Sequence, residues 1–155
     1  MSDRIIVATF DNTDAAYDAA AAIKDLTRIG GADFKLKAGV MVQKNTIGVV
    51  STLESRDRPP LATVITTAVG ALVGLIGGPP GAAIGAAVGA GAGLTGDLIT
   101  MMFDDRFVES VISDMQPGST SLIVEADEGS TRAVDDIVAL RHGKVHRQEM
   151  NRAAA

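Results

Sequence analysis

Hydrophobic and polar positions follow a strand period in some stretches of the chain and a helix period in others. Residues 4–10 form a short apolar run rich in β-branched side chains, closed by helix-capping residues at 11–14. From residue 13 onward, apolar side chains recur at helical spacing until Gly30 and Gly31, which suit a helix end. The pattern predicts a strand followed by a helix.

A β-hairpin is expected next. Residues 34–42 alternate between apolar and polar side chains, which is the period of a strand exposed on one face. A turn at 44–46 then leads into a second apolar run at 47–50. These two runs are predicted to pair as antiparallel strands.

The last third of the chain repeats the alternation of helix and strand. Residues 103–115 place apolar side chains on one face of a predicted helix, which opens with Asp104 and Asp105 and is broken by Pro117 and Gly118. Strands are predicted at 120–126 and, as a final edge strand, at 144–147, with a helix at 130–140 between them.

This order of elements predicts an α+β fold. Its first six elements match the ferredoxin-like split β-α-β arrangement, in which helices cover one face of an antiparallel sheet. The other face of such a sheet is open to a partner. We expect this face to contribute to self-association.

Charge divides the chain into three parts. Residues 1–58 carry eight basic and eight acidic side chains, residues 59–96 carry none, and residues 97–155 carry six basic and eleven acidic ones. We therefore assign 1–58 and 97–155 to two halves of one α/β domain, the second with a basic C-terminal tail. Residues 59–96 are assigned to an insert between them.

The insert has glycines every four residues, in two series. Such spacing places them on one face of a helix. Glycine inside a helix costs about 0.5–1 kcal/mol relative to alanine, so close packing of helix backbones must compensate. We predict that the insert is a helical hairpin broken near residues 77–81. Its oligomerisation surface would consist of Gly70, Gly74, Gly78, Gly77, Gly81, Gly85, Gly89 and Gly93.

The two arms of this hairpin differ in hydrophobicity. As helices, 61–78 and 79–96 would each be about 27 Å long, close to the ~30 Å hydrocarbon core of a bilayer. The second arm has three large aliphatic residues and the first has eight. Those eight are predicted to face the membrane: Leu61, Val64, Ile65, Val69, Leu72, Val73, Leu75 and Ile76.

Two interpretations of the hairpin stay open. It oligomerises in or on a membrane, or it is buried at the centre of a soluble homo-oligomer and contacts no lipid. A flexible linker is disfavoured, because a linker needs neither large aliphatic residues nor a regular glycine spacing. The favoured localisation is the cytoplasmic membrane with the α/β domain in the cytoplasm, and the alternative is the cytoplasm.

Composition and motifs indicate no enzymatic chemistry. The chain has no cysteine, which excludes disulfides, thiolate metal sites and cysteine nucleophiles, and its net charge of −5 argues against nucleic-acid binding. The G-x-G-x-x-G match at 91–96 lies in an apolar glycine-rich segment rather than between a strand and a helix, so it is interpreted as coincidence.

The remaining candidate ligands also favour structural roles. His142 and His146 have the spacing of a helical metal pair, but Gly143 opposes a helix between them. Asp104–Asp105 and Asp135–Asp136 are interpreted as helix-start charges and a solvated face. We expect no enzyme activity, cofactor, metal or small-molecule substrate, and as partners a second copy of the chain and membrane lipid.

The chain resembles a bacterial family of predicted membrane proteins called domain of unknown function 1269. The resemblance lies in the 5–10 strand, the glycine-rich 70–96 segment, and the 103–123 block with its sequence Gln-Pro-Gly-Ser-Thr-Ser-Leu at 116–122. It covers nearly the whole chain and implies a bacterial origin. It implies no activity.

Overall fold

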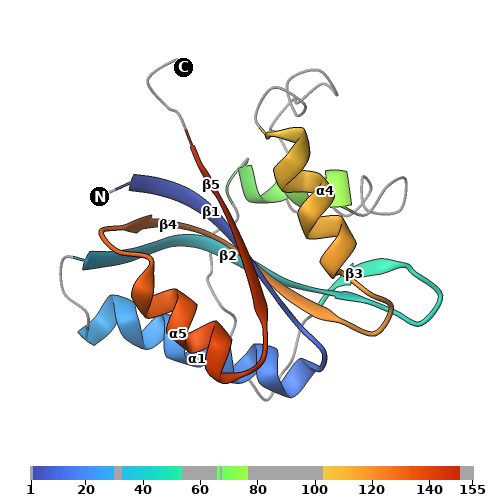
Figure 1. Cartoon of the computed structure of the whole chain (residues 1–155), viewed down its shortest axis with the longest axis horizontal. Coiled ribbons are helices and arrows are strands. Elements are labelled where there is room, and N and C mark those ends of the chain that lie inside the picture. Colours follow the sequence, from blue (N-terminus) through green and yellow to red (C-terminus); the bar gives the residue numbers. More distant parts are fainter. Residues whose placement is uncertain (1, 30–32, 54–65, 67, 77–102, 151–155) are drawn as a thin grey trace.

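The computed structural model describes residues 2–29, 33–53, 66, 68–76 and 103–150. In chain order the labelled elements are β1 (Ser2–Phe10), α1 (Thr13–Ile29), β2 (Phe34–Lys44), β3 (Val50–Thr52), α4 (Asp105–Asp114), β4 (Thr120–Glu128), α5 (Arg132–Leu140) and β5 (Lys144–Glu149). A further short helix covers residues 68–76, between β3 and α4. The predicted α+β class is confirmed (Figure 1).

The strands form one five-stranded sheet in the order β3-β2-β4-β1-β5. Every neighbouring pair is antiparallel. Helix α1 links β1 to β2 and helix α5 links β4 to β5, and each of these connections passes over one intervening strand. The sheet therefore interleaves the two ends of the chain, with β4 between β1 and β2.

The first face of the sheet is covered by α1 and α5 (Figure 1). Alternate residues of β1, including Ile6 and Phe10, point into this layer, as Leu122 and Val124 of β4 do. The buried side of α1 contributes Ile23 and three alanines. Small side chains let α1 pack close to the sheet, and the predicted helix at 13–29 is confirmed.

The second face of the sheet is covered by α4 and the helix at 68–76. The intervening residues of the same strands, such as Ile5 and Ile123, point into this layer. The expectation of an open second face is therefore wrong. The reason is that α4, counted by the sequence pattern among the first-face helices, packs on the opposite side.

The hairpin of β2 and β3 is confirmed, but its turn is longer than predicted. Strand β3 begins at Val50 rather than at Ile47. The side-chain Oδ1 of Asn45 accepts hydrogen bonds from the backbone N–H groups of Ile47 and Val49, at 3.0 and 2.9 Å. These bonds give residues 45–49 an ordered turn in place of the first residues of a strand.

The turn between α5 and β5 depends on Gly143. A Cβ at this position would lie 2.5 Å from Cε1 of Phe10 and 2.8 Å from Cγ1 of Val138. The preceding residue, His142, ends the helix in the left-handed region at φ 57°. The chain therefore crosses directly over the Phe10 ring before it enters β5.

Candidate functional site

The candidate site is the layer on the second face, because the uncharged segment joins the folded domain there. The helix at 68–76 is the described part of that segment. Its backbone starts at Thr66, whose carbonyl oxygen accepts from Gly70 N–H at 3.0 Å and whose hydroxyl accepts from Val69 N–H at 3.3 Å. A capping threonine thus sets where this helix begins.

Apolar side chains of this helix lie in the core of the domain. Val69, Leu72 and Val73 are completely buried in the same cluster as the second-face residues of β1, β2 and β4. Leu75 and Ile76 pack against that cluster and are partly buried. For Val69, Leu72 and Val73, the structure places a sheet where the sequence predicted lipid. Length and hydrophobicity do not distinguish these two apolar surroundings.

The structure describes two of the eight predicted oligomerisation glycines. Gly70 is buried and Gly74 is partly buried, so the small-residue side of this helix is within the folded domain. The other six glycines, Gly77, Gly78, Gly81, Gly85, Gly89 and Gly93, lie outside the described residues, as do Leu61, Val64 and Ile65.

Helix α4 contributes the other half of the layer. Asp104 is its N-cap and accepts from Arg106 N–H at 3.1 Å, which confirms the structural interpretation of this aspartate. Phe107 and Val111 are buried, and the rings of Phe103 and Phe107 stack with centroids 6.2 Å apart. This aromatic pair lies in the second-face cluster.

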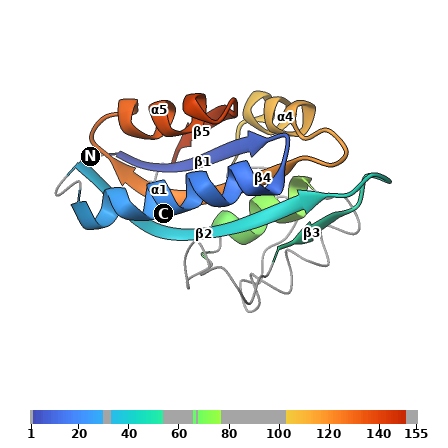
Figure 2. The ribbon, with the colours of Figure 1, turned by 90° about the horizontal axis from the view of Figure 1, so that it is seen from below.

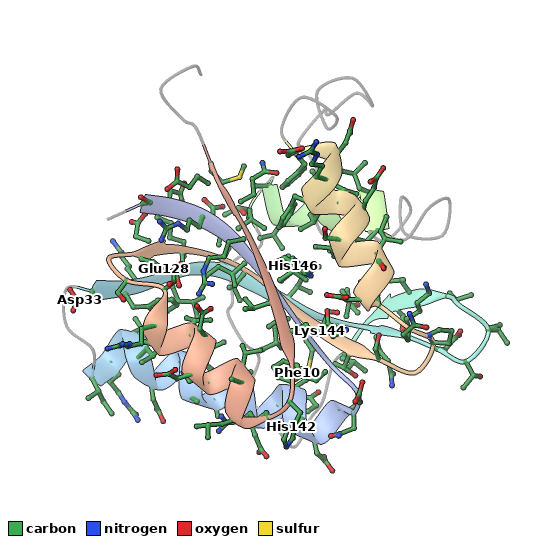
Figure 3. The ribbon with its side chains drawn as sticks, in the orientation of Figure 1. Phe10, Asp33, Glu128, His142, Lys144 and His146 are labelled. Carbon is green, nitrogen blue, oxygen red and sulfur yellow. The ribbon has the colours of Figure 1, made fainter. Side chains whose placement is uncertain are left out.

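Polar contacts attach both ends of α4 to β5. Near the N-terminus, Asp104 N–H donates to Oε1 of Gln148 at 2.7 Å. Near the C-terminus, the Asp114 carboxylate contacts Nε2 of His146, and Nζ of Lys144 lies 3.7 Å from it. Figure 3 shows His146 and Lys144 on the side of β5 toward α4. His146 is therefore a structural partner of α4.

A small pocket opens on the outer side of this layer. It is lined by Leu75, Phe103 and Val108, with Asp105 and Glu109 beside them. The pocket lies between the end of the 68–76 helix and the start of α4.

The second face also has a charged interior that the sequence analysis missed. Glu125 is completely buried in the middle of β4, opposite Ile5 and Ala38 in the strand register. On the same face, Nζ of Lys37 lies 3.4 Å from a carboxylate oxygen of Asp3 and 3.4 Å from one of Asp127. A glutamate directly after the apolar residues 122–124 of the predicted strand was the available signal.

On the first face, charges are gathered into one ion-pair network. The side chain of Glu128 is completely buried and lies 2.9 Å from Nε of Arg147 and 3.3 Å from Nη1 of Arg4. Arg147 also donates to Asp135 at 2.5 Å and to the Thr131 carbonyl oxygen at 3.1 Å. The network ties the start of α5 to β4 and β5, and Asp135 is therefore not simply a solvated charge.

The surroundings of Arg147 shift the pKa of its guanidinium. Burial is the largest single influence and lowers the pKa of the guanidinium. Hydrogen bonds to Glu128 and Asp135, with the negative charges of both carboxylates, together outweigh burial, so the pKa is raised. The guanidinium therefore stays charged, and its role is structural.

Other candidates have these positions. His142 is exposed and lies two residues after the end of α5. Among the described residues, no group of three or more His, Cys, Asp or Glu side chains is placed to hold a metal ion. The G-x-G-x-x-G match at 91–96 falls outside those residues. None of the helices in the described ranges has the length and apolar character needed to cross a membrane.

The chain belongs to the family of proteins of unknown function DUF1269. The family model matches residues 61–155, which is more than half of the chain and includes most of the uncharged segment, together with α4, β4, α5 and β5. Comparison with curated proteins and with solved structures gives no match. The resemblance noted from the sequence is confirmed at the level of the family.

Proposed function

We propose that this protein is a non-enzymatic, self-assembling protein that forms homo-oligomers through the glycine-rich hairpin of residues 59–96. The observation that carries the proposal is the way this segment joins the fold. Its described part is a helix with Gly70 buried and Leu72 completely buried against the sheet. Because the helix at 68–76 is packed in the core, it anchors the rest of the 59–96 segment to the domain. The remaining glycines of that segment are then available for contacts between copies.

The fold proposed for the domain is ferredoxin-like, with a different set of elements from the one expected. The six elements are β1, α1, β2, β4, α5 and β5, in which each helix connects strands separated by one other strand. In this proposal β3, the hairpin and α4 are additions between β2 and β4. The order β2-β4-β1-β5 within the sheet supports this assignment.

The proposed site of assembly is the cytoplasmic membrane. The charge-free stretch of 38 residues supports this location. Residues 61–65 of the first arm, with Leu61, Val64 and Ile65, are the proposed lipid contacts. The α/β domain would then lie in the cytoplasm.

The second candidate is a soluble homo-oligomeric scaffold in which the hairpins are buried in the assembly. The burial of Val69, Leu72 and Val73 against the sheet favours it, because these residues already have an apolar environment within one copy. Both candidates use the same glycines for assembly. Both therefore predict a lower particle mass when those glycines are replaced by leucine.

The test of self-assembly substitutes Gly85→Leu and Gly89→Leu and measures particle mass by light scattering. We expect the mass to fall while the circular dichroism spectrum of the α/β domain is unchanged, because a leucine side chain separates helices that pack through glycine. Ala21→Leu, at an exposed position of α1, is the matched control. An unchanged mass in both glycine variants would refute self-assembly through this segment.

Flotation of untagged protein on a density gradient after a carbonate wash then separates the two candidates. Carbonate-resistant flotation supports the membrane form. A monodisperse particle of many subunits without lipid or detergent supports the soluble scaffold.

A further inference from the structure

The turn between β2 and β3 presents exposed aliphatic side chains on an ordered backbone. Ile47 is 84% exposed and Val49 is 37% exposed. Besides the two bonds accepted by the Asn45 side chain, Asn45 N–H donates to the Val49 carbonyl oxygen at 2.9 Å and Gly48 N–H donates to the Asn45 carbonyl oxygen at 3.0 Å. The turn therefore holds Ile47 outward at little further entropic cost on binding.

A second turn supports this one from the side. Lys44 N–H donates to the Ser119 carbonyl oxygen at 3.0 Å, and Gly118 N–H donates to the Lys44 carbonyl oxygen at 2.6 Å. Gly118 has a φ of 90°, which suits glycine. Figure 2 shows the β2–β3 turn and the turn between α4 and β4 at the same end of the sheet. We call this end the hairpin tip, defined by residues 44–49 and 117–119.

The hairpin tip differs in charge from the rest of an acidic chain. Between residues 38 and 53 the one charged residue is Lys44, and residues 115–124 have none, whereas the net charge of the chain is −5. The Lys44 side chain lies along the turn, with its Cε 3.9 Å from the position that a Cβ on Gly48 would take. An exposed aliphatic pair and one cation are thus combined on one convex projection.

We propose that the hairpin tip binds the surface of an anionic bilayer, with Ile47 and Val49 in the interfacial layer and Lys44 at the lipid headgroups. A protein partner is the weaker fit, since a stable protein interface buries about 800 Å² on each side and a convex turn offers much less. A bilayer interface accepts single apolar side chains, and a basic residue beside them adds attraction to anionic lipid.

This inference rests on the membrane form of the proposed function, but it uses no glycine of the hairpin. In the proposed function, the oligomerisation glycines of the 59–96 segment set the particle mass, whereas the hairpin tip sets the affinity of the domain for a lipid surface. Measuring both quantities on the same protein tells a failure of one proposal from a failure of the other.

The experiment is co-sedimentation of the full chain with vesicles of phosphatidylcholine, with and without phosphatidylserine. Ile47→Asp is expected to lower the partition coefficient about tenfold or more on phosphatidylserine vesicles, as loss of a buried aliphatic side chain predicts. Ile29→Asp is the matched control, because Ile29 is 77% exposed at the end of α1 nearest the start of β2, away from the tip. Lys44→Gln is expected to remove the preference for phosphatidylserine.

Each outcome decides the proposal. Binding that Ile47→Asp weakens and Ile29→Asp leaves unchanged supports it, whatever the particle mass of the Gly85→Leu variant. Equal binding by wild type and Ile47→Asp, or no vesicle binding by wild type, overturns it. A change in lipid-free particle mass with Ile47→Asp, without a change in vesicle binding, makes the tip a contact between copies and also overturns it.

Discussion

The two faces of the sheet are built from the same strands but differ in what covers them. The first face is covered by α1 and α5, the connections between its own strands, and its charges form a network around Glu128. The second face is covered by α4 and by the helix at 68–76, which is the described part of the uncharged segment. Polar contacts at the two ends of α4 connect this layer to β5.

This difference indicates a division of roles between the faces. The first face completes a sheet that interleaves both ends of the chain, so it serves mainly the stability of the domain. The second face holds the described part of the segment proposed for assembly, the helix at 68–76. A partner or a membrane that acts on that segment would act on the second face first.

Leu72→Ala gives the largest expected effect and tests whether the 68–76 helix belongs to the core. Leu72 is completely buried in the second-face cluster, so its truncation should lower the free energy of unfolding by about 2–5 kcal/mol. Urea denaturation measures this change. Leu140→Ala, at a side chain 78% exposed on α5, should change stability by less than about 0.5 kcal/mol. Equal stability of the two variants would contradict a core position for this helix.

Arg147→Ala tests the first face, with an expected loss of about 3 kcal/mol. It removes one of two cations from the completely buried Glu128 and leaves Arg4 as the remaining one in the network. Arg28→Ala breaks the exposed pair with Asp25 and should cost less than about 1 kcal/mol. Chemical denaturation of both variants gives the comparison, and equal losses would argue against a structural role for the network.

The raised pKa of Arg147 predicts how the destabilisation caused by Arg147→Ala depends on pH. A group whose pKa is higher in the folded state stabilises fully below its unfolded pKa, and that stabilisation is lost as pH rises through the folded pKa. For a guanidinium this window is strongly alkaline. The destabilisation caused by Arg147→Ala should therefore not vary with the ionisation of Arg147 between about pH 5 and 9. If wild type and Arg147→Ala had the same free energy of unfolding at pH 9 but not at lower pH, that result would argue against a charged Arg147.

Asp114→Asn has the smallest expected effect on stability. It tests whether the second-face layer can be destabilised without affecting the first-face layer. It weakens the contact with His146 and Lys144, with an expected cost of about 1 kcal/mol. Hydrogen exchange of α4 amides should become faster while that of α5 amides is unchanged. Glu109→Gln, on the exposed side of α4, is the control. Faster exchange in both helices would show that the two faces do not open separately.

Element positions could be predicted because their causes are local. The alternation at 34–42, the glycines that follow residue 29 and the aspartates that open α4 act over a few residues each. The start of β3 could not be predicted from hydrophobicity, because the Asn45 side chain orders a turn through residues that a strand pattern includes.

The candidate site was less predictable, because the identity of an apolar side chain does not show whether it contacts lipid or a protein core. Val69, Leu72 and Val73 suit lipid or a protein core equally well by composition, and the second-face position of α4 decides between them. The ion-pair partners of His146 and Arg147 could not be predicted either, because Asp114 and Glu128 are distant from them in sequence.

The sequence by itself determined the order of the labelled helices and strands, the charge-free segment with its glycine spacing, and the family. Those features depend on neighbours along the chain, where side-chain period and backbone preference act directly. Only the tertiary structure decided the strand order, which face α4 covers, and which aliphatic residues are buried. Each depends on contacts between distant segments, in which the fit of two surfaces selects among arrangements that the local pattern permits equally.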